Sequence, residues 1–71
     1  MNGFQISLAA ARVNAKLTQA EVAEKMKVSK NIIVEIEAGR REVKPHELVY
    51  LSKLYNIDEE YICVPTVTTK S

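Results

Sequence analysis

The sequence contains a single cysteine, Cys63, so no disulfide can form within the chain. Small secreted domains commonly depend on disulfides, and the lack of a cysteine pair favours a protein of the reducing cytosol. The sequence also has no run of about 18 apolar residues that could cross a membrane, and no basic segment precedes the apolar stretch near its N-terminus. We therefore expect a cytoplasmic protein with no export signal and no membrane partner.

Glycine and proline occur only twice each, at Gly3, Gly39, Pro45 and Pro65. Because these residues interrupt regular structure, the long segments between them are free to form helices. Apolar residues make up 46% of the chain and charged residues 27%, which is the balance of a folded globular domain. With 71 residues the chain is one domain, with little room for a deep substrate pocket beside its own core.

Two helices are predicted in the first part of the chain from residue spacing and capping. Within residues 4–15, apolar residues recur every three or four positions beside several alanines, which favour helix. Thr18 and Glu21 have the spacing of a capping box, in which each side chain accepts a hydrogen bond from the backbone of the other residue. This spacing predicts a second helix over about residues 19–26.

A third helix is predicted over about residues 30–38, with Ser29 as its N-cap and Gly39 as its left-handed end. Pro45 suits the first position of a fourth helix, and Asp58 is expected to cap a last short turn. The residues of the fourth helix expected to face the core are Leu48, Leu51 and Leu54 together with Val49 or Tyr55, and Tyr50 is expected in the core as well.

The net charge of +1 is low for a nucleic-acid-binding domain, but the charges are unevenly distributed. Residues 1–45 carry a net charge of +3 and residues 46–71 a net charge of −2. The second and third predicted helices, joined by a short turn at about residues 27–28, lie in the basic part. This arrangement, over about residues 18–38, is typical of a helix-turn-helix, whose second helix enters the DNA major groove while the first crosses the backbone.

Individual residues strengthen this interpretation, and the positions that carry it are Arg12, Leu17, Thr18, Gln19, Ala23, Val28, Ser29, Ile33, Ile36, Glu37, Ala38, Gly39, Pro45, Leu48, Leu51, Leu54 and Ile57. The chain resembles the Xre/Cro/C1-type helix-turn-helix repressor family over residues 6–62, and the resemblance implies an all-α, compact five-helix domain like that of lambda repressor. It further implies a bacterial or phage transcriptional regulator that binds a palindromic operator in double-stranded DNA as a homodimer. Residues 63–71 are expected to form a loose tail or part of the dimer contact.

The resemblance also implies roles for individual residues. The candidates to read base edges are Ser29, Lys30 and Asn31, with Ile32 and Glu35 one turn further along the same surface. An asparagine can pair with adenine, a lysine with guanine, an isoleucine with a thymine methyl group and a glutamate with the cytosine amino group. The candidates to contact phosphates are Gln19, Arg40, Arg41 and Lys44, although any of them could be an ordinary solvated residue.

Two further expectations concern the core and the dimer. By the same resemblance, Arg12 and Glu37 form a partly buried ion pair that joins the first and third helices. Tyr61, Ile62 and Cys63 are the candidates for a dimer contact, because tyrosines are enriched at interfaces and this end of the family's domain carries the two-fold contact. The alternative is that the tyrosines cover the domain's own core.

The third helix departs from the family pattern in being apolar almost all round, with Ile32 and Val34 beside the acidic Glu35. This departure leaves open a second function, a protein-interaction module of the antitoxin or accessory-subunit kind that holds a protein partner on this face. The sequence contains no motif of an enzyme or a cofactor site, and His46 has no nearby histidine or cysteine with which to bind a metal. We therefore expect no catalysis, no cofactor and no metal, and a protein that acts at the nucleoid.

Overall fold

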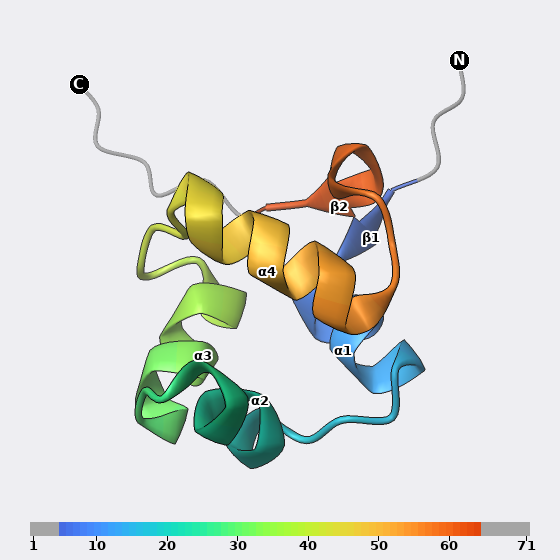
Figure 1. Ribbon diagram of the computed structural model, residues 1–71. Coiled ribbons are helices and arrows are strands. Elements are labelled where there is room, and N and C mark those ends of the chain that lie inside the picture. Colours follow the sequence, from blue (N-terminus) through green and yellow to red (C-terminus); the bar gives the residue numbers. More distant parts are fainter. Residues whose placement is uncertain (1–4, 65–71) are drawn as a thin grey trace, which may run out of the picture.

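The computed structural model describes residues 5–64, which form four α-helices, one 3₁₀ turn and two short strands. Helices α2 and α3 lie together at one end of the molecule, α4 crosses its middle, and α1 lies beside the two strands on the far side (Figure 1). None of the helices described is long and apolar enough to cross a membrane. The elements in chain order are β1 (Ile6–Ser7), α1 (Leu8–Asn14), α2 (Gln19–Met26), α3 (Lys30–Ala38), α4 (Pro45–Tyr55), the 3₁₀ turn η1 (Glu59–Tyr61) and β2 (Ile62–Cys63).

The all-α class is confirmed, but the expected count of five helices is wrong, because the last of them is a single 3₁₀ turn. The start of α2 is built by the predicted capping box. The Glu21 amide donates to Thr18 Oγ1 at 3.1 Å, and the Thr18 amide donates to Glu21 Oε1 at 2.8 Å. Ser29 precedes α3 and Asp58 precedes η1, as expected, but neither side chain makes a capping hydrogen bond.

The first helix begins at Leu8, and the prediction that it begins at residue 4 is wrong for residues 5–7. Ile6 and Ser7 are extended and pair in parallel with Ile62 and Cys63, in the register Ile6 to Ile62 and Ser7 to Cys63. Ser7 also caps α1, since its Oγ accepts a hydrogen bond from the Ala10 amide at 3.0 Å. Cys63, the first residue of the expected tail of residues 63–71, therefore belongs to this small sheet, and residues 65–71 lie outside the described residues.

The core lies where α1, α2, α3 and α4 meet, and β2 closes it from the side of the sheet. Tyr55, and not Tyr50, is the tyrosine of α4 that enters the core: Tyr55 is 7% exposed and Tyr50 41% exposed, so the expectation for Tyr50 is wrong. Leu51 is buried, as expected, whereas Leu48 and Leu54 are only half-buried. The buried apolar residues are Leu8, Ala11, Val22, Ala23, Ile33, Ile36, Leu51, Tyr55 and Ile62.

Candidate nucleic-acid interface

The helix-turn-helix expected at residues 18–38 is formed by α2 and α3, which pack closely on each other. Helix α2 ends at Met26, and the next residue, Lys27, caps it with a left-handed backbone at a φ of 61°. The Val28 amide then donates to the Ala23 carbonyl at 3.0 Å, which closes the last turn of α2. Ala23 is 3% exposed, and at such a buried position a larger side chain would force the surrounding helices apart. The short turn therefore fixes the orientation of α3 relative to α2.

The beginning of α3 presents three exposed polar residues, Ser29, Lys30 and Asn31. Ile32 follows them but is half-buried and packs against the core, so the expectation that it lies on the exposed surface is wrong. Val34 is also half-buried. Of the apolar residues of α3, Ile33 and Ile36 are buried in the core and Ile32 packs against it, whereas Val34 is not part of this cluster.

Glu35 is half-buried and forms an ion pair with Arg41, in which Glu35 Oε1 lies 3.8 Å from Arg41 Nε. The loop that contains Arg41 is tied back to α3, since the Arg40 amide donates to the Glu35 carbonyl at 2.9 Å. Arg40 and Lys44 are exposed. The loop after α3 therefore holds cations close to this helix, and Arg41 partly neutralises the carboxylate of Glu35.

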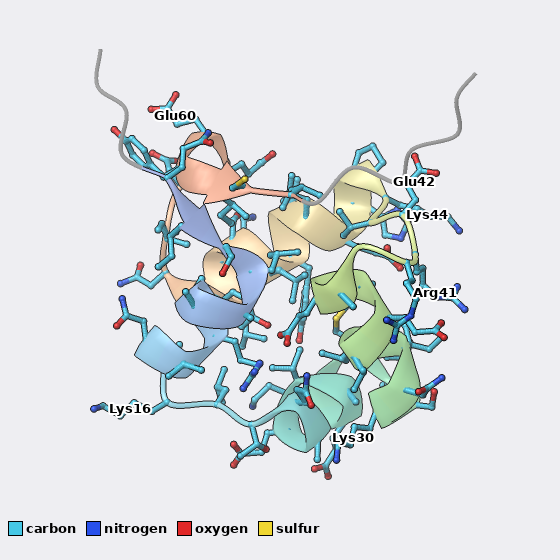
Figure 2. The ribbon with its side chains drawn as sticks, turned by 180° about the vertical axis from the view of Figure 1, so that it is seen from behind. Lys16, Lys30, Arg41, Glu42, Lys44 and Glu60 are labelled. Atoms are coloured by element: carbon cyan, nitrogen blue, oxygen red, sulfur yellow. The ribbon has the colours of Figure 1, made fainter. Side chains whose placement is uncertain are left out.

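The cations beside α3 lie far from the acidic end of the protein. Figure 2 shows Lys30, Arg41 and Lys44 on the side formed by α3 and the loop that follows it, with Glu42 beside Lys44. Glu60 lies at the opposite end, on η1. A duplex approaching the α3 side meets mainly cations, which favours phosphate binding.

Arg12 and Glu37 are brought together and form an ion pair between α1 and α3, with Arg12 Nε 2.7 Å from Glu37 Oε2. A second guanidinium nitrogen, Nη2, lies 3.3 Å from Glu37 Oε1, and Nη1 donates to the Leu17 carbonyl at 2.9 Å. The side chains are 13% and 8% exposed, respectively. Hydrogen bonding to Glu37 raises the pKa of Arg12 above its ordinary value, although desolvation acts in the other direction.

Gln19, the first residue of α2, takes part in the same cluster, because its Nε2 donates to Glu37 Oε1 at 3.0 Å. The sequence did not predict this hydrogen bond, since nothing in the local spacing relates Gln19 to a residue of α3. The amides of Gln19 and Ala20 stand at the first two helical positions and have no hydrogen-bond partner within residues 5–64. They therefore leave donors at the N-terminus of α2 where an anion is favoured.

Tyr55 lies next to this cluster. Burial raises the pKa of Tyr55 to about 12, and the negative charge of Glu37 adds to the effect, while the positive charge of Arg12 opposes it. The neutral phenol is thus the form that the fold favours. Tyr55 therefore connects the apolar core with the polar cluster of Arg12, Glu37 and Gln19.

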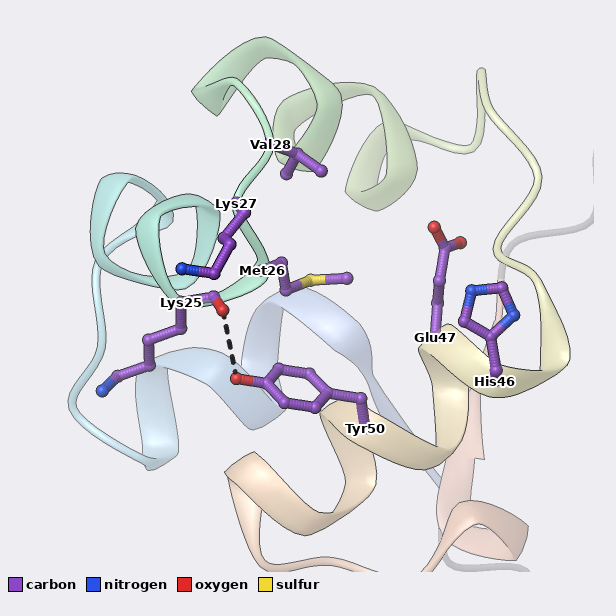
Figure 3. A pocket seen from close by; sticks show the side chains of 7 residues that line it. All are labelled: Lys25, Met26, Lys27, Val28, His46, Glu47 and Tyr50. Atoms are coloured by element: carbon purple, nitrogen blue, oxygen red, sulfur yellow. Dashed lines mark hydrogen bonds between the residues drawn. The ribbon is translucent and has the colours of Figure 1, made fainter.

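A pocket of about 390 Å³ lies between two parts of the chain (Figure 3). One is the end of α2 with the turn that follows it, and the other is the start of α4. The Tyr50 ring forms one wall, and its hydroxyl donates to the Lys25 carbonyl at 3.4 Å, which connects α4 to the end of α2. Met26 and Val28 supply apolar surface, while the remaining lining residues are charged or polar. Local sequence patterns do not predict this pocket, because it depends on how α4 is placed relative to α2. The lining residues are Lys25, Met26, Lys27, Val28, His46, Glu47 and Tyr50.

The dimer candidates are only partly at the surface. Tyr61 is 39% exposed and Cys63 is exposed. Ile62 is 5% exposed and belongs to the core, so its expected place in a contact between protomers is wrong. The reason is the strand pairing of β2 with β1, which turns Ile62 inward.

Comparison with known proteins agrees with this geometry. A helix-turn-helix family model matches residues 8–62, which is more than half of the chain. The matched segment contains α1 to α4 and η1, and it includes the motif formed by α2 and α3. No curated protein and no solved structure matches the chain significantly.

Proposed function

Because the chain belongs to the helix-turn-helix family of the Cro/C1 type, we propose that it is a sequence-specific transcriptional regulator. In this proposal it binds a palindromic operator as a homodimer and represses the promoter that contains it. It works in the cytoplasm at the nucleoid. No catalytic step is involved. The observation that carries the proposal is the exposed polar start of α3, together with the exposed cations of the loop that follows the same helix.

In the proposed complex, the start of α3 lies in the major groove. Asn31 is suited to pair with adenine, and Lys30 with guanine or a phosphate, because both side chains are exposed at the first turn of the helix. Ser29 precedes them and can reach a base or a phosphate. Ile32 has only part of its side chain available for a thymine methyl group.

Phosphate contacts flank the groove in this arrangement. The N-terminus of α2, with Gln19, meets one phosphate, since a helix N-terminus favours an anion. Arg40, Arg41 and Lys44 meet the backbone on the other side. Two protomers related by a two-fold axis place their α3 helices about 34 Å apart, one turn of DNA, which requires a palindromic site. Tyr61 and Cys63 lie at the proposed contact between the protomers.

Selection of bound sequences from a pool of random duplexes tests the proposal, followed by affinity measurement at several salt concentrations. We expect enrichment of a palindrome and a loss of affinity of about tenfold or more for a few-fold rise in salt. Asn31→Ala is expected to lose about 1–3 kcal/mol of discrimination at one base pair in each half-site. Asn14→Ala is the matched control, because Asn14 is also exposed but ends α1.

Binding without any sequence preference would contradict the proposed regulator. In the alternative of a protein-interaction module, the partner would contact Val34 and the exposed part of Ile32, which otherwise packs against the core. If the protein purified with a protein partner and Val34→Lys released that partner, the protein-interaction module would replace the proposed regulator.

A further inference from the structure

The polar cluster around Glu37 joins three parts of the chain that lie far apart in sequence. Arg12 on α1 holds both carboxylate oxygens of Glu37, at 2.7 Å and 3.3 Å. Glu37 Oε1 also accepts a hydrogen bond from Gln19 Nε2 at 3.0 Å. Glu37 is only 8% exposed, so the protein itself, and not water, determines where its oxygens lie.

This geometry fixes the side chain of Gln19. A glutamine amide nitrogen has two N–H groups, and only one of them is used by Glu37. The second N–H and the amide plane are therefore held in a defined direction at the first turn of α2. An unrestrained glutamine would lose rotamer freedom on contact with a ligand, and holding the side chain beforehand removes that cost.

We propose that Glu37 is a positioning residue for the phosphate contact of Gln19, with Arg12 holding Glu37 in place. The inference rests on the proposed function, because it assumes that the N-terminus of α2 meets a DNA phosphate. Glu37 itself does not contact DNA in this arrangement, and the adjacent guanidinium of Arg12 compensates its negative charge. The core ion pair thereby contributes to DNA affinity separately from its contribution to stability.

Two double variants separate these contributions. Arg12→Met with Glu37→Met removes the ion pair and also the oxygen that accepts from Gln19. Arg12→Met with Glu37→Gln removes the same ion pair but retains an amide oxygen at the same position in the side chain. Replacing both partners of a buried ion pair with residues of similar volume avoids an unpaired charge and is often neutral for stability.

The assay is fluorescence anisotropy with a labelled duplex at fixed low salt, at a temperature where urea unfolding shows each variant to be fully folded. A phosphate contact does not depend on base sequence, so a duplex of arbitrary sequence is sufficient. We expect the Glu37→Met double variant to bind about threefold to tenfold more weakly than the native chain. The Glu37→Gln double variant is expected to bind within about twofold of the native chain.

Gln19→Ala completes the thermodynamic cycle. We expect it to weaken binding in the native and Glu37→Gln backgrounds and to have no further effect in the Glu37→Met background. Equal affinities of the two double variants, or an equal effect of Gln19→Ala in all backgrounds, would overturn the inference while leaving the proposed function intact. If the native chain itself failed to bind any duplex at low salt, the proposed function would fail first and this inference with it.

A measurement on the native chain keeps the inference testable if a double variant does not fold. We expect NMR relaxation to show the Gln19 side-chain amide as rigid as the backbone of α2. The other glutamine of the chain, Gln5, is exposed and serves as the mobile reference. A Gln19 amide as mobile as that of Gln5 would overturn the inference.

Discussion

Replacing Arg12 with alanine removes the guanidinium that holds Glu37. The change deletes hydrogen bonds from Nε and Nη2 to the carboxylate and from Nη1 to the Leu17 carbonyl. Breaking a fully buried pair from one side costs about 3–5 kcal/mol, because the other charge is left uncompensated. The side chains here are 13% and 8% exposed and Gln19 still donates to Glu37, so water and the amide offset part of the loss.

We therefore expect Arg12→Ala to lower the free energy of unfolding by about 2–4 kcal/mol. A chain of 71 residues has a total stability of about 4–11 kcal/mol, so this loss is a large share of it. The corresponding fall in Tm is about 10–25 °C. Urea unfolding followed by far-ultraviolet circular dichroism measures the loss at pH 7, provided that the denaturant slope stays unchanged.

Arg41→Ala is the matched control. Arg41 also pairs with a glutamate, Glu35, but at 3.8 Å and with side chains that are 49% and 33% exposed. Exposed pairs of this kind contribute less than about 1 kcal/mol. If Arg12→Ala cost no more than Arg41→Ala, the argument that burial makes the Arg12 pair structurally important would be refuted.

Two further predictions concern the pH dependence of stability and the start of α2. Because burial raises the pKa of Tyr55 to about 12, its stabilising effect is complete below pH 10 and is lost as the pH rises from about 10 to about 12. Unfolding measured against pH should therefore lose about 2–3 kcal/mol more in the native chain than in Tyr55→Phe, and parallel curves would contradict this. Thr18→Ala should cost about 1 kcal/mol, because the hydroxyl accepts from the Glu21 amide. Ser29→Ala should cost only a few tenths, since Ser29 makes no capping hydrogen bond, and equal losses in thermal unfolding would refute the distinction.

The features that sequence reasoning predicted are those that depend on neighbouring residues. The capping box of Thr18 and Glu21 and the left-handed end of α3 at Gly39 are local, and both are present. Which of Tyr50 and Tyr55 is buried does not depend on neighbouring residues alone. It depends on which face of α4 is turned toward the other helices. A helical pattern of apolar residues allowed either tyrosine to face inward, and only the packing of α4 decides between them.

The sheet and the hydrogen bond of Gln19 were missed for a related reason. Strands of two residues are too short to show alternation, and Ile6 and Ile62 pair across almost the whole described chain. Gln19 reaches Glu37 only because the turn of the motif brings α2 and α3 together. The residues of a site can therefore be proposed from a family pattern, whereas the contacts that orient them depend on the folded arrangement.

In the proposed complex, Glu35 is a negative charge on the helix that meets DNA, in a protein whose net charge is only +1. Its ion pair with Arg41 would compete with the phosphate contact proposed for that arginine, and its own negative charge would repel the DNA backbone. Glu35→Gln is therefore expected to raise affinity for an arbitrary duplex about threefold to tenfold and to steepen the salt dependence by about one phosphate contact per protomer. Glu59→Gln is the control, because it removes an equal charge from the exposed turn η1.

The same variant also separates the two roles open to Glu35. If the carboxylate accepts a hydrogen bond from a cytosine amino group, Glu35→Gln should weaken binding to the selected operator while it strengthens binding to unrelated sequences. If Glu35 only restrains Arg41, both affinities should rise together. An unchanged affinity and salt dependence for every duplex would show that neither residue lies near the DNA, and the placement of α3 in the groove would then be wrong.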